Sequence, residues 1–283
     1  MNEIVDLYGY CGYERGNAGG GSLHCLVPQL LQPDRDRKRP AVLILPGGGY
    51  HHTSQREGEP VALRFAAAGY GTFVLHYSCD PGVRYPVALR EAAMAMRYIR
   101  ENAEAFAIDP DMVAALGFSA GGHLCGCLGT LFDSGEVSDL GTPALLRPDA
   151  LCLCYPVSIS WGRTHEGSFQ NLCGDDAQLR QRLSLETLVR PDMPPVFLWH
   201  TRSDASVPCV GSLILARALE EAGIDFAMHI YRSGVHGLAT GGIESNPPES
   251  LRGISPDLPQ WMEACIGFLG ETGFRISDER KHV

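Results

Sequence analysis

Basic residues are scarce in this 283-residue sequence, which holds 23 lysines and arginines against 33 acidic residues and has a formal net charge of −10. A chain of this charge is a poor partner for the polyanionic backbone of nucleic acids. The one basic cluster, at residues 34–40, is interrupted by aspartates and closed by Pro40, which favours a solvated turn. We therefore expect no nucleic-acid partner.

A long uninterrupted apolar run is also lacking. The first ten residues, MNEIVDLYGY, include early acidic side chains and no basic start followed by an apolar segment, so they predict no secretory signal. Residues 112–132 are apolar, but their five glycines and His123 divide them into a strand, a turn and a helix. We expect a cytoplasmic protein that does not enter a membrane.

Zinc-type cysteine spacing is missing, although the chain has 10 cysteines. Cys125 and Cys127, like Cys152 and Cys154, are one residue apart, whereas structural zinc sites usually begin with two to four residues between ligands. Buried free thiols in a reducing compartment are the better interpretation. The phosphate-binding patterns GxxxxGK[ST] and GxGxxG after a strand are absent too, so we expect neither a metal nor a cofactor.

Beyond residue 40, short apolar runs alternate with helical patterns. This alternation is typical of a mostly parallel sheet with helices on both faces, and the near-continuous apolar character suits strands that are buried on both sides. The expected strands are residues 41–46, 71–78, 112–118, 150–157, 195–201 and 226–231. Helices are expected at residues 60–68, 85–106 with Asp109-Pro110 ending it, 208–223 and 258–269.

Residues 158–190 depart from the alternation, so we interpret them as an insertion over the strand ends and the active site. No internal repeat or long low-complexity linker divides the chain. One domain over residues 1–283 is the economical interpretation.

The stretch GFSAGG places Ser119 between small residues, directly after an apolar run. A strained turn that carries a nucleophile from a strand into a helix needs such neighbours. A serine hydroxyl also needs a base, and the base needs an acid that fixes its tautomer. His236 follows the last expected strand and Asp204 follows the one before, whereas Asp225, at the start of the last strand, is the weaker candidate acid.

Ester hydrolysis further requires donors for the developing oxyanion, and the glycine loop PGGGY supplies them after the first central strand. Gly48, Gly49 and Ala120 are the candidate donors. Candidate substrate contacts are His51 and His52 beside the loop, and Trp161, whose ring would stack on a sugar or an aromatic acyl group or anchor the insertion.

Several polar residues have two interpretations. Glu57 and Glu59 either touch the pocket or cap the following helix, and capping is favoured. The remaining histidines of interest are interpreted as structural, three because they lie within expected strands and one because it lies on the helix after the nucleophile: His76, His200, His229 and His123.

Together PGGGY, GFSAGGHL, the segment Asp204–Pro208 and GVHG resemble the α/β-hydrolase superfamily of esterases and lipases, over residues 41 to about 270. The run PGGGYHHTSQREGEPVALRFAAAGYGTFVLHYS is similar to bacterial acetyl-xylan or feruloyl esterases, although Pro46 stands where the related HGGG loop has histidine. The resemblance implies the α/β-hydrolase fold and a cofactor-free serine carboxylesterase that cleaves small acyl esters, such as acetyl or feruloyl groups on xylan-derived saccharides. Ser119 would attack, His236 would move the proton and Asp204 would orient it.

The superfamily also contains peptidases, formamidases, lipases and lactonases, so these activities remain alternatives. A non-catalytic binding protein is the alternative from another class, and a complete triad argues against it. The partner we expect is a small-molecule ester, and the sequence leaves the oligomeric state open.

Overall fold

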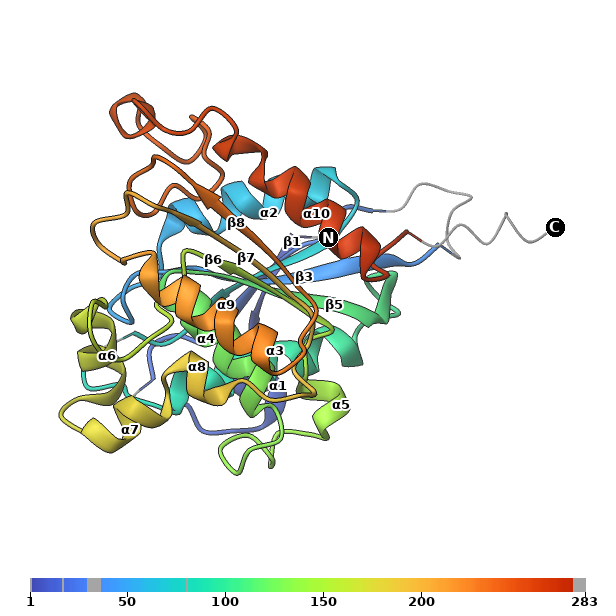
Figure 1. Cartoon of the computed structure of the whole chain (residues 1–283). Coiled ribbons are helices and arrows are strands. Elements are labelled where there is room, and N and C mark those ends of the chain that lie inside the picture. Colours follow the sequence, from blue (N-terminus) through green and yellow to red (C-terminus); the bar gives the residue numbers. More distant parts are fainter. Residues whose placement is uncertain (1, 17, 30–36, 80, 277–283) are drawn as a thin grey trace.

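Eight strands form one sheet in the computed structural model, which describes residues 2–16, 18–29, 37–79 and 81–276 (Figure 1). Strands β3 to β8 run parallel, and β1 and β2 run antiparallel at one edge. The mostly parallel sheet is therefore confirmed. In spatial order the strands are β1 (Asn2–Asp6), β2 (Ser22–Leu26), β4 (Gly71–His76), β3 (Arg39–Leu45), β5 (Ile108–Phe118), β6 (Ala150–Cys154), β7 (Val196–Thr201) and β8 (Phe226–Tyr231).

Helices cover both faces of the sheet, as expected (Figure 1). Helices α2 (Glu59–Ala67) and α10 (Trp261–Glu271) lie on one face, and α1 (Leu7–Cys11), α3 (Val87–Glu101), α4 (Ala120–Leu131) and α9 (Val210–Glu221) lie on the other. The sheet has a hydrophobic core on each face: the first lies under α2 and α10, and the second lies under α3, α4 and α9. Side chains of strand β3 alternate between them, since Val42 and Ile44 join the first core and Leu43 and Leu45 join the second.

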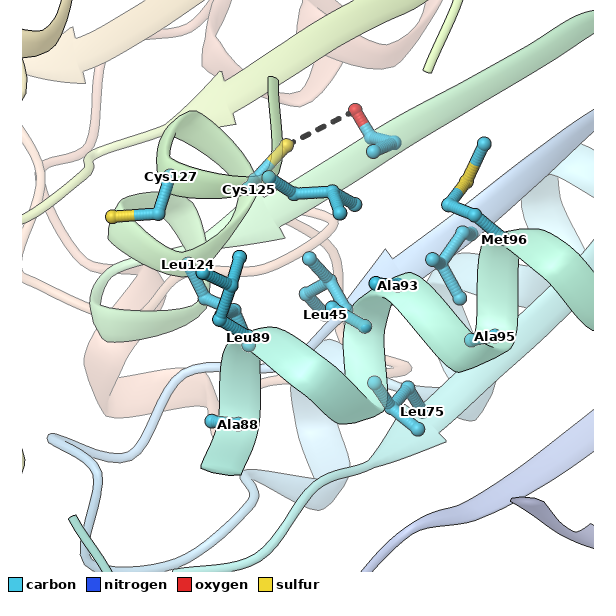
Figure 2. Packing of buried hydrophobic residues seen from close by; sticks show 14 of the residues in the cluster. Leu45, Leu75, Ala88, Leu89, Ala93, Ala95, Met96, Leu124, Cys125 and Cys127 are labelled. Carbon is cyan, nitrogen blue, oxygen red and sulfur yellow. Dashed lines mark hydrogen bonds between the residues drawn. The ribbon is translucent and has the colours of Figure 1, made fainter. Parts of the chain in front are cut away.

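The second core depends on close packing of α3 and α4 against the sheet. Figure 2 shows Leu89 beside Leu124 of α4, and the small side chain of Ala93 near Leu45 of β3. Small residues let a helix approach a sheet closely, which keeps the interior densely packed. The paired cysteines are buried in these cores, as expected: Cys125, Cys127, Cys152 and Cys154.

Several expected boundaries were wrong. The long helix begins at Val87 and ends at Glu101, not at residues 85 and 106. Asp109 and Pro110 lie inside β5, which starts at Ile108, so they do not end the helix. Arg39, assigned to a solvated turn, opens β3 and is 3% exposed, because its amide donates to Ala107 O and its strand enters the core. Residues 34–36 of that turn lie outside the described residues.

The antiparallel strands β1 and β2 were not predicted. The first, NEIVD, mixes charged and apolar residues and is half exposed at the sheet edge, so it lacks the apolar run that marks the central strands.

Residues 158–190 carry three short helices between β6 and β7: α6 (Glu166–Cys173), α7 (Ala177–Arg182) and α8 (Leu185–Leu188). We call this segment the insertion. The one-domain organisation stays a prediction. Within the described ranges, no helix combines the length and the apolar character that crossing a bilayer requires.

Candidate active site

Ser119 lies at the sharp turn between β5 and α4, with φ 53° and ψ −118°. Its amide donates to Cys154 O at 3.0 Å, which fixes the turn to the neighbouring strand β6. The flanking glycines are required by space, because a Cβ on Gly117 would lie 2.1 Å from Gly121 O, and one on Gly121 would lie 2.1 Å from Leu45 O. The small residues around Ser119 thus let helix and strand meet while the hydroxyl projects from the turn.

Ser119, His236 and Asp204 form one hydrogen-bonded chain. His236 Nε2 lies 2.8 Å from Ser119 Oγ, and His236 Nδ1 lies 2.6 Å from Asp204 Oδ2. The loops that carry the last two are fastened together, because the Gly234 amide donates to Ser203 Oγ and Ser203 Oγ donates to Gly234 O. The sequence-predicted residues therefore meet, although they come from three separate strand ends. Asp225 is exposed at the start of β8.

The Asp204 side chain is fully buried. Burial by itself raises the pKa of this carboxyl, but hydrogen bonds from His200 and His236 outweigh it and hold the pKa well below its usual range. The Ser206 and Val207 amides also donate to Asp204 Oδ1, each at 2.9 Å. The site therefore holds a charged carboxylate against the imidazole of His236. His200, interpreted from the sequence as structural, stabilises the charged form of Asp204.

The glycine loop after β3 lies beside Ser119. Gly48 and Gly49 have φ of 124° and 65°, which a residue with a Cβ adopts only with strain. Within the described part of the chain, the amides of Gly48, Gly49 and Ala120 have no backbone acceptor, and the two glycines line the same pocket as Ser119. This is the arrangement that preorganised donors for an oxyanion require.

Glu57 supports the glycine loop and lines the cavity, so of its two interpretations the structure agrees with the pocket contact and not with the cap of α2. Its carboxylate is buried, where Oε2 accepts from the Gly47 amide at 2.9 Å and Oε1 accepts from Tyr155 Oη at 2.8 Å. Tyr155 Oη in turn accepts from the Ala239 amide at 3.0 Å, and its ring lies edge-on to His236, with centroids 5.0 Å apart. Glu57 thus links the glycine loop to the loop of His236. Glu59 lies in the first turn of α2.

A cavity of about 470 Å³ opens over Ser119, and His51 and His52 line it as expected. Trp161 does not line it: the indole is 54% exposed on the insertion, and its Nε1 donates to Glu186 Oε1 at 2.7 Å. Trp161 therefore lies outside the lining of this cavity, and the insertion directs other residues into it.

Those residues are His165 and Asn171, which sequence reasoning missed. His165 caps α6, and burial, then the nearby His236, lowers its pKa. Asn171 Nδ2 donates to Gly49 O at 2.9 Å, so a hydrogen bond fastens the insertion to the glycine loop. Only their place in an insertion over the strand ends signalled such a role. Ser206 and Arg56 also line the cavity.

Comparison with known proteins agrees with this geometry. Residues 29–143 match the BD-FAE family, and residues 92–245, more than half of the chain, match the prolyl oligopeptidase family. The crystal structure of an acetyl ester-xyloside bifunctional hydrolase from Caldicellulosiruptor lactoaceticus is 34% identical, with a TM-score of 0.80 over 96% of this chain and 97% of that one. The chain belongs to the α/β-hydrolase superfamily and is an esterase-type member.

Other relatives of this α/β hydrolase have related names. The endo-1,4-beta-xylanase B of Butyrivibrio fibrisolvens is 37% identical over 220 residues, which are 74% of this chain and 34% of that protein. The acetylxylan esterase of Xylanibacter ruminicola is 29% identical over 262 residues, 86% of this chain and 52% of that protein. The hydrolase thus spans about a third to a half of these two relatives.

In the described part of the hydrolase, no group of three or more histidine, cysteine or acidic side chains is arranged to hold a metal ion. His123 Nδ1 accepts from Tyr50 Oη at 2.7 Å, and its Nε2 donates to Leu183 O at 2.7 Å, so this buried ring joins α4 to the insertion.

Proposed function

We propose that this α/β hydrolase is a serine carboxylesterase that removes small acyl groups, acetyl above all, from saccharide alcohols. The observation that carries the proposal is the hydrogen-bonded chain from Ser119 through His236 to Asp204, beside the amides of the glycine loop. A nucleophile, a base, an orienting acid and oxyanion donors are the parts that acyl transfer needs.

In this proposal Ser119 Oγ attacks the ester carbonyl while its proton passes to His236 Nε2. The amides of Gly48, Gly49 and Ala120 donate hydrogen bonds to the negatively charged oxygen of the tetrahedral intermediate. Its collapse expels the alcohol, which takes the proton from His236. Water then gives a proton to His236 and attacks the acyl group on Ser119, and the carboxylic acid leaves as the serine regains its proton.

The walls of the cavity support a small acyl group and a polar alcohol. None of its described lining residues is aliphatic, and the only rings are histidines: Gly48, Gly49, His51, His52, Ser54, Arg56, Glu57, Ser119, His165, Asn171, Ser206, His236 and Gly237. Long acyl chains and feruloyl rings gain affinity from large aliphatic and aromatic side chains, and the described lining residues include none. Polar side chains suit a sugar, and the relatives named for acetylxylan and acetyl ester-xyloside support that alcohol.

A peptidase is the second candidate, because residues 92–245 match the prolyl oligopeptidase family. A cytoplasmic location is also part of the proposal, supported by the buried cysteines Cys125, Cys127, Cys152 and Cys154, none of which forms a disulfide.

A substrate panel separates these activities. We would compare 4-nitrophenyl acetate, butyrate and octanoate, methyl ferulate, acetylated xylo-oligosaccharides and a peptide 4-nitroanilide, and we expect acetate esters to have the highest kcat/KM. Ser119→Ala should lower kcat by more than about 10⁴-fold with unchanged circular dichroism, since alanine fits the turn but forms no acyl-enzyme. A fluorophosphonate should add its mass to the peptide that contains Ser119. Faster cleavage of the anilide, or full activity in the alanine variant, would contradict the proposal.

A further inference from the structure

A second hollow lies beside the cavity over Ser119. The two cavities, of about 470 and 330 Å³, share His51 and His52 as lining residues, so the exposed pair forms the rim between them. We call the second cavity the side hollow. Its far walls come from the loop at Gly20, from the start of β2 and from the end of β4.

The walls of the side hollow are held in place by backbone contacts. The Gly20 amide donates to Ser78 Oγ at 2.9 Å, and the Gly21 amide donates to His76 O at 2.8 Å. A Cβ on Gly20 would lie 2.4 Å from the Ser78 amide nitrogen, so only glycine lets the loop lie this close to β4. The hollow is therefore preformed, which lowers the entropic cost of binding.

The chemistry of the walls selects a neutral, hydroxyl-rich ligand. Ser22 and Thr53 contribute hydroxyls, and Thr53 Oγ1 lies 3.1 Å from His76 Nδ1. Burial and the neighbouring His24 lower the pKa of His76, so its imidazole is neutral at neutral pH and offers one donor and one acceptor. None of the described lining residues is Asp, Glu, Lys or Arg, so the polar groups that they offer are uncharged at neutral pH.

We infer that the side hollow is a subsite for a second sugar unit of an O-acetylated oligosaccharide whose acetylated unit lies over Ser119. The inference rests on the proposed esterase function. An ester on a sugar inside a chain leaves neighbouring units attached to the alcohol, and these units need a polar space next to the reacting centre. The side hollow is such a space, and its volume lies at the lower end of the roughly 300–1,000 Å³ typical of ligand sites.

The inference predicts a dependence on chain length. We would measure kcat/KM for 4-nitrophenyl acetate, an acetylated methyl xyloside and singly acetylated xylobiose. In the wild-type enzyme, the disaccharide should exceed the monosaccharide by about three- to tenfold, as one or two added hydrogen bonds allow. Thr53→Val and Ser22→Ala should reduce that ratio toward one and leave 4-nitrophenyl acetate unchanged. Thr272→Val is the matched control, because this half-buried threonine caps α10 and lies outside the side hollow.

A wild-type ratio near one, or a ratio that all three variants retain, would overturn the subsite while acetate hydrolysis still stood. A wild-type enzyme that hydrolyses no acetate ester would instead refute the proposed function. If the variants fail to fold, inhibition of 4-nitrophenyl acetate hydrolysis decides: unacetylated xylobiose should inhibit the wild type at a concentration about three- to tenfold lower than xylose does. Equal inhibition by the two sugars would overturn the inference.

Discussion

Asp204 accepts more hydrogen bonds than orientation of His236 alone requires. Two backbone amides bind one oxygen, and His236 binds the other, with His200 Nε2 at 3.4 Å from it. This places the carboxylate rigidly and keeps it charged, so the imidazole has one tautomer available for contact with Ser119. Removing the charge while keeping the shape tests that role.

Asp204→Asn should lower kcat by about 10³–10⁴-fold with a small change in KM, because the amide holds the imidazole in the wrong tautomer. Steady-state kinetics with 4-nitrophenyl acetate measure both constants. Asp225→Asn is the matched control, since that carboxylate is exposed at the start of β8 and should leave kcat unchanged. A crippled Asp225→Asn beside an active Asp204→Asn would reverse the assignment.

Tyr155 joins two loops of the site through Glu57, and Tyr155→Phe should therefore reduce kcat about tenfold or more with little change in KM. Without the hydroxyl, the Ala239 amide and the Glu57 carboxylate both lose a buried partner, and the loops of His236 and Gly47 shift. Measurement of kcat, KM and the urea midpoint in the same preparation separates a catalytic effect from loss of stability.

Tyr8→Phe provides the comparison, because Tyr8 Oη donates to the buried Glu91 at 2.8 Å, as Tyr155 does to Glu57, but outside the active site. Both variants should lose stability, and only Tyr155→Phe should lose kcat. Equal kcat losses in the two would mean that Tyr155 is merely structural.

At the scale of elements, the sequence predicted the central strands because they are buried on both faces and must be apolar along their length. The ends of the helices and strands were harder to predict from the sequence. Asp109 and Pro110 looked like a helix stop, yet β5 tolerates them at its partly exposed beginning, before the core is reached. The strand β1 carries too few apolar residues for its sequence to distinguish it from a loop.

The candidate site divides in the same way. Ser119, Asp204 and His236 were predictable because each follows a strand, and parallel strands deliver their carboxyl ends to one edge. Asn171 and Glu57 were not, since their partners are set by how the insertion and the glycine loop pack together. No local pattern encodes such contacts. For Trp161 the sequence left both stacking on a ligand and anchoring of the insertion open, and its bond to Glu186 outside the cavity depends on how the insertion folds.

At the scale of the whole molecule, His123 makes stability depend on pH. Burial lowers the pKa of His123 from 6.5 to about 4. The unfolded chain, with histidine near ~6.5, therefore binds more protons than the folded one between these values, so stability falls as pH drops through this window and is fully present above it. The free energy of unfolding should fall by about 3 kcal/mol as pH drops through this window. Asp204, whose pKa is lowered from 3.8, acts below the window.

Urea unfolding at pH 7.0, 5.5 and 4.5 tests this contribution. His123→Gln cannot titrate, so it should be less stable at pH 7.0 yet lose less stability on acidification than the wild type. Matched slopes in the two proteins would show that His123 does not carry the effect. The comparison also cancels the other histidines, which both proteins share.

The hydrogen bond from Asn171 to Gly49 joins positions 122 residues apart in the chain. Through this bond the insertion takes part in both substrate choice and catalysis. The segment that would select the substrate also holds the carbonyl of Gly49, a candidate oxyanion donor. Replacing the insertion with that of a relative, in order to change substrate preference, would then also change kcat. This effect is avoided only if the new segment places a side-chain amide where Asn171 has its own. Preference and speed would have to be engineered together.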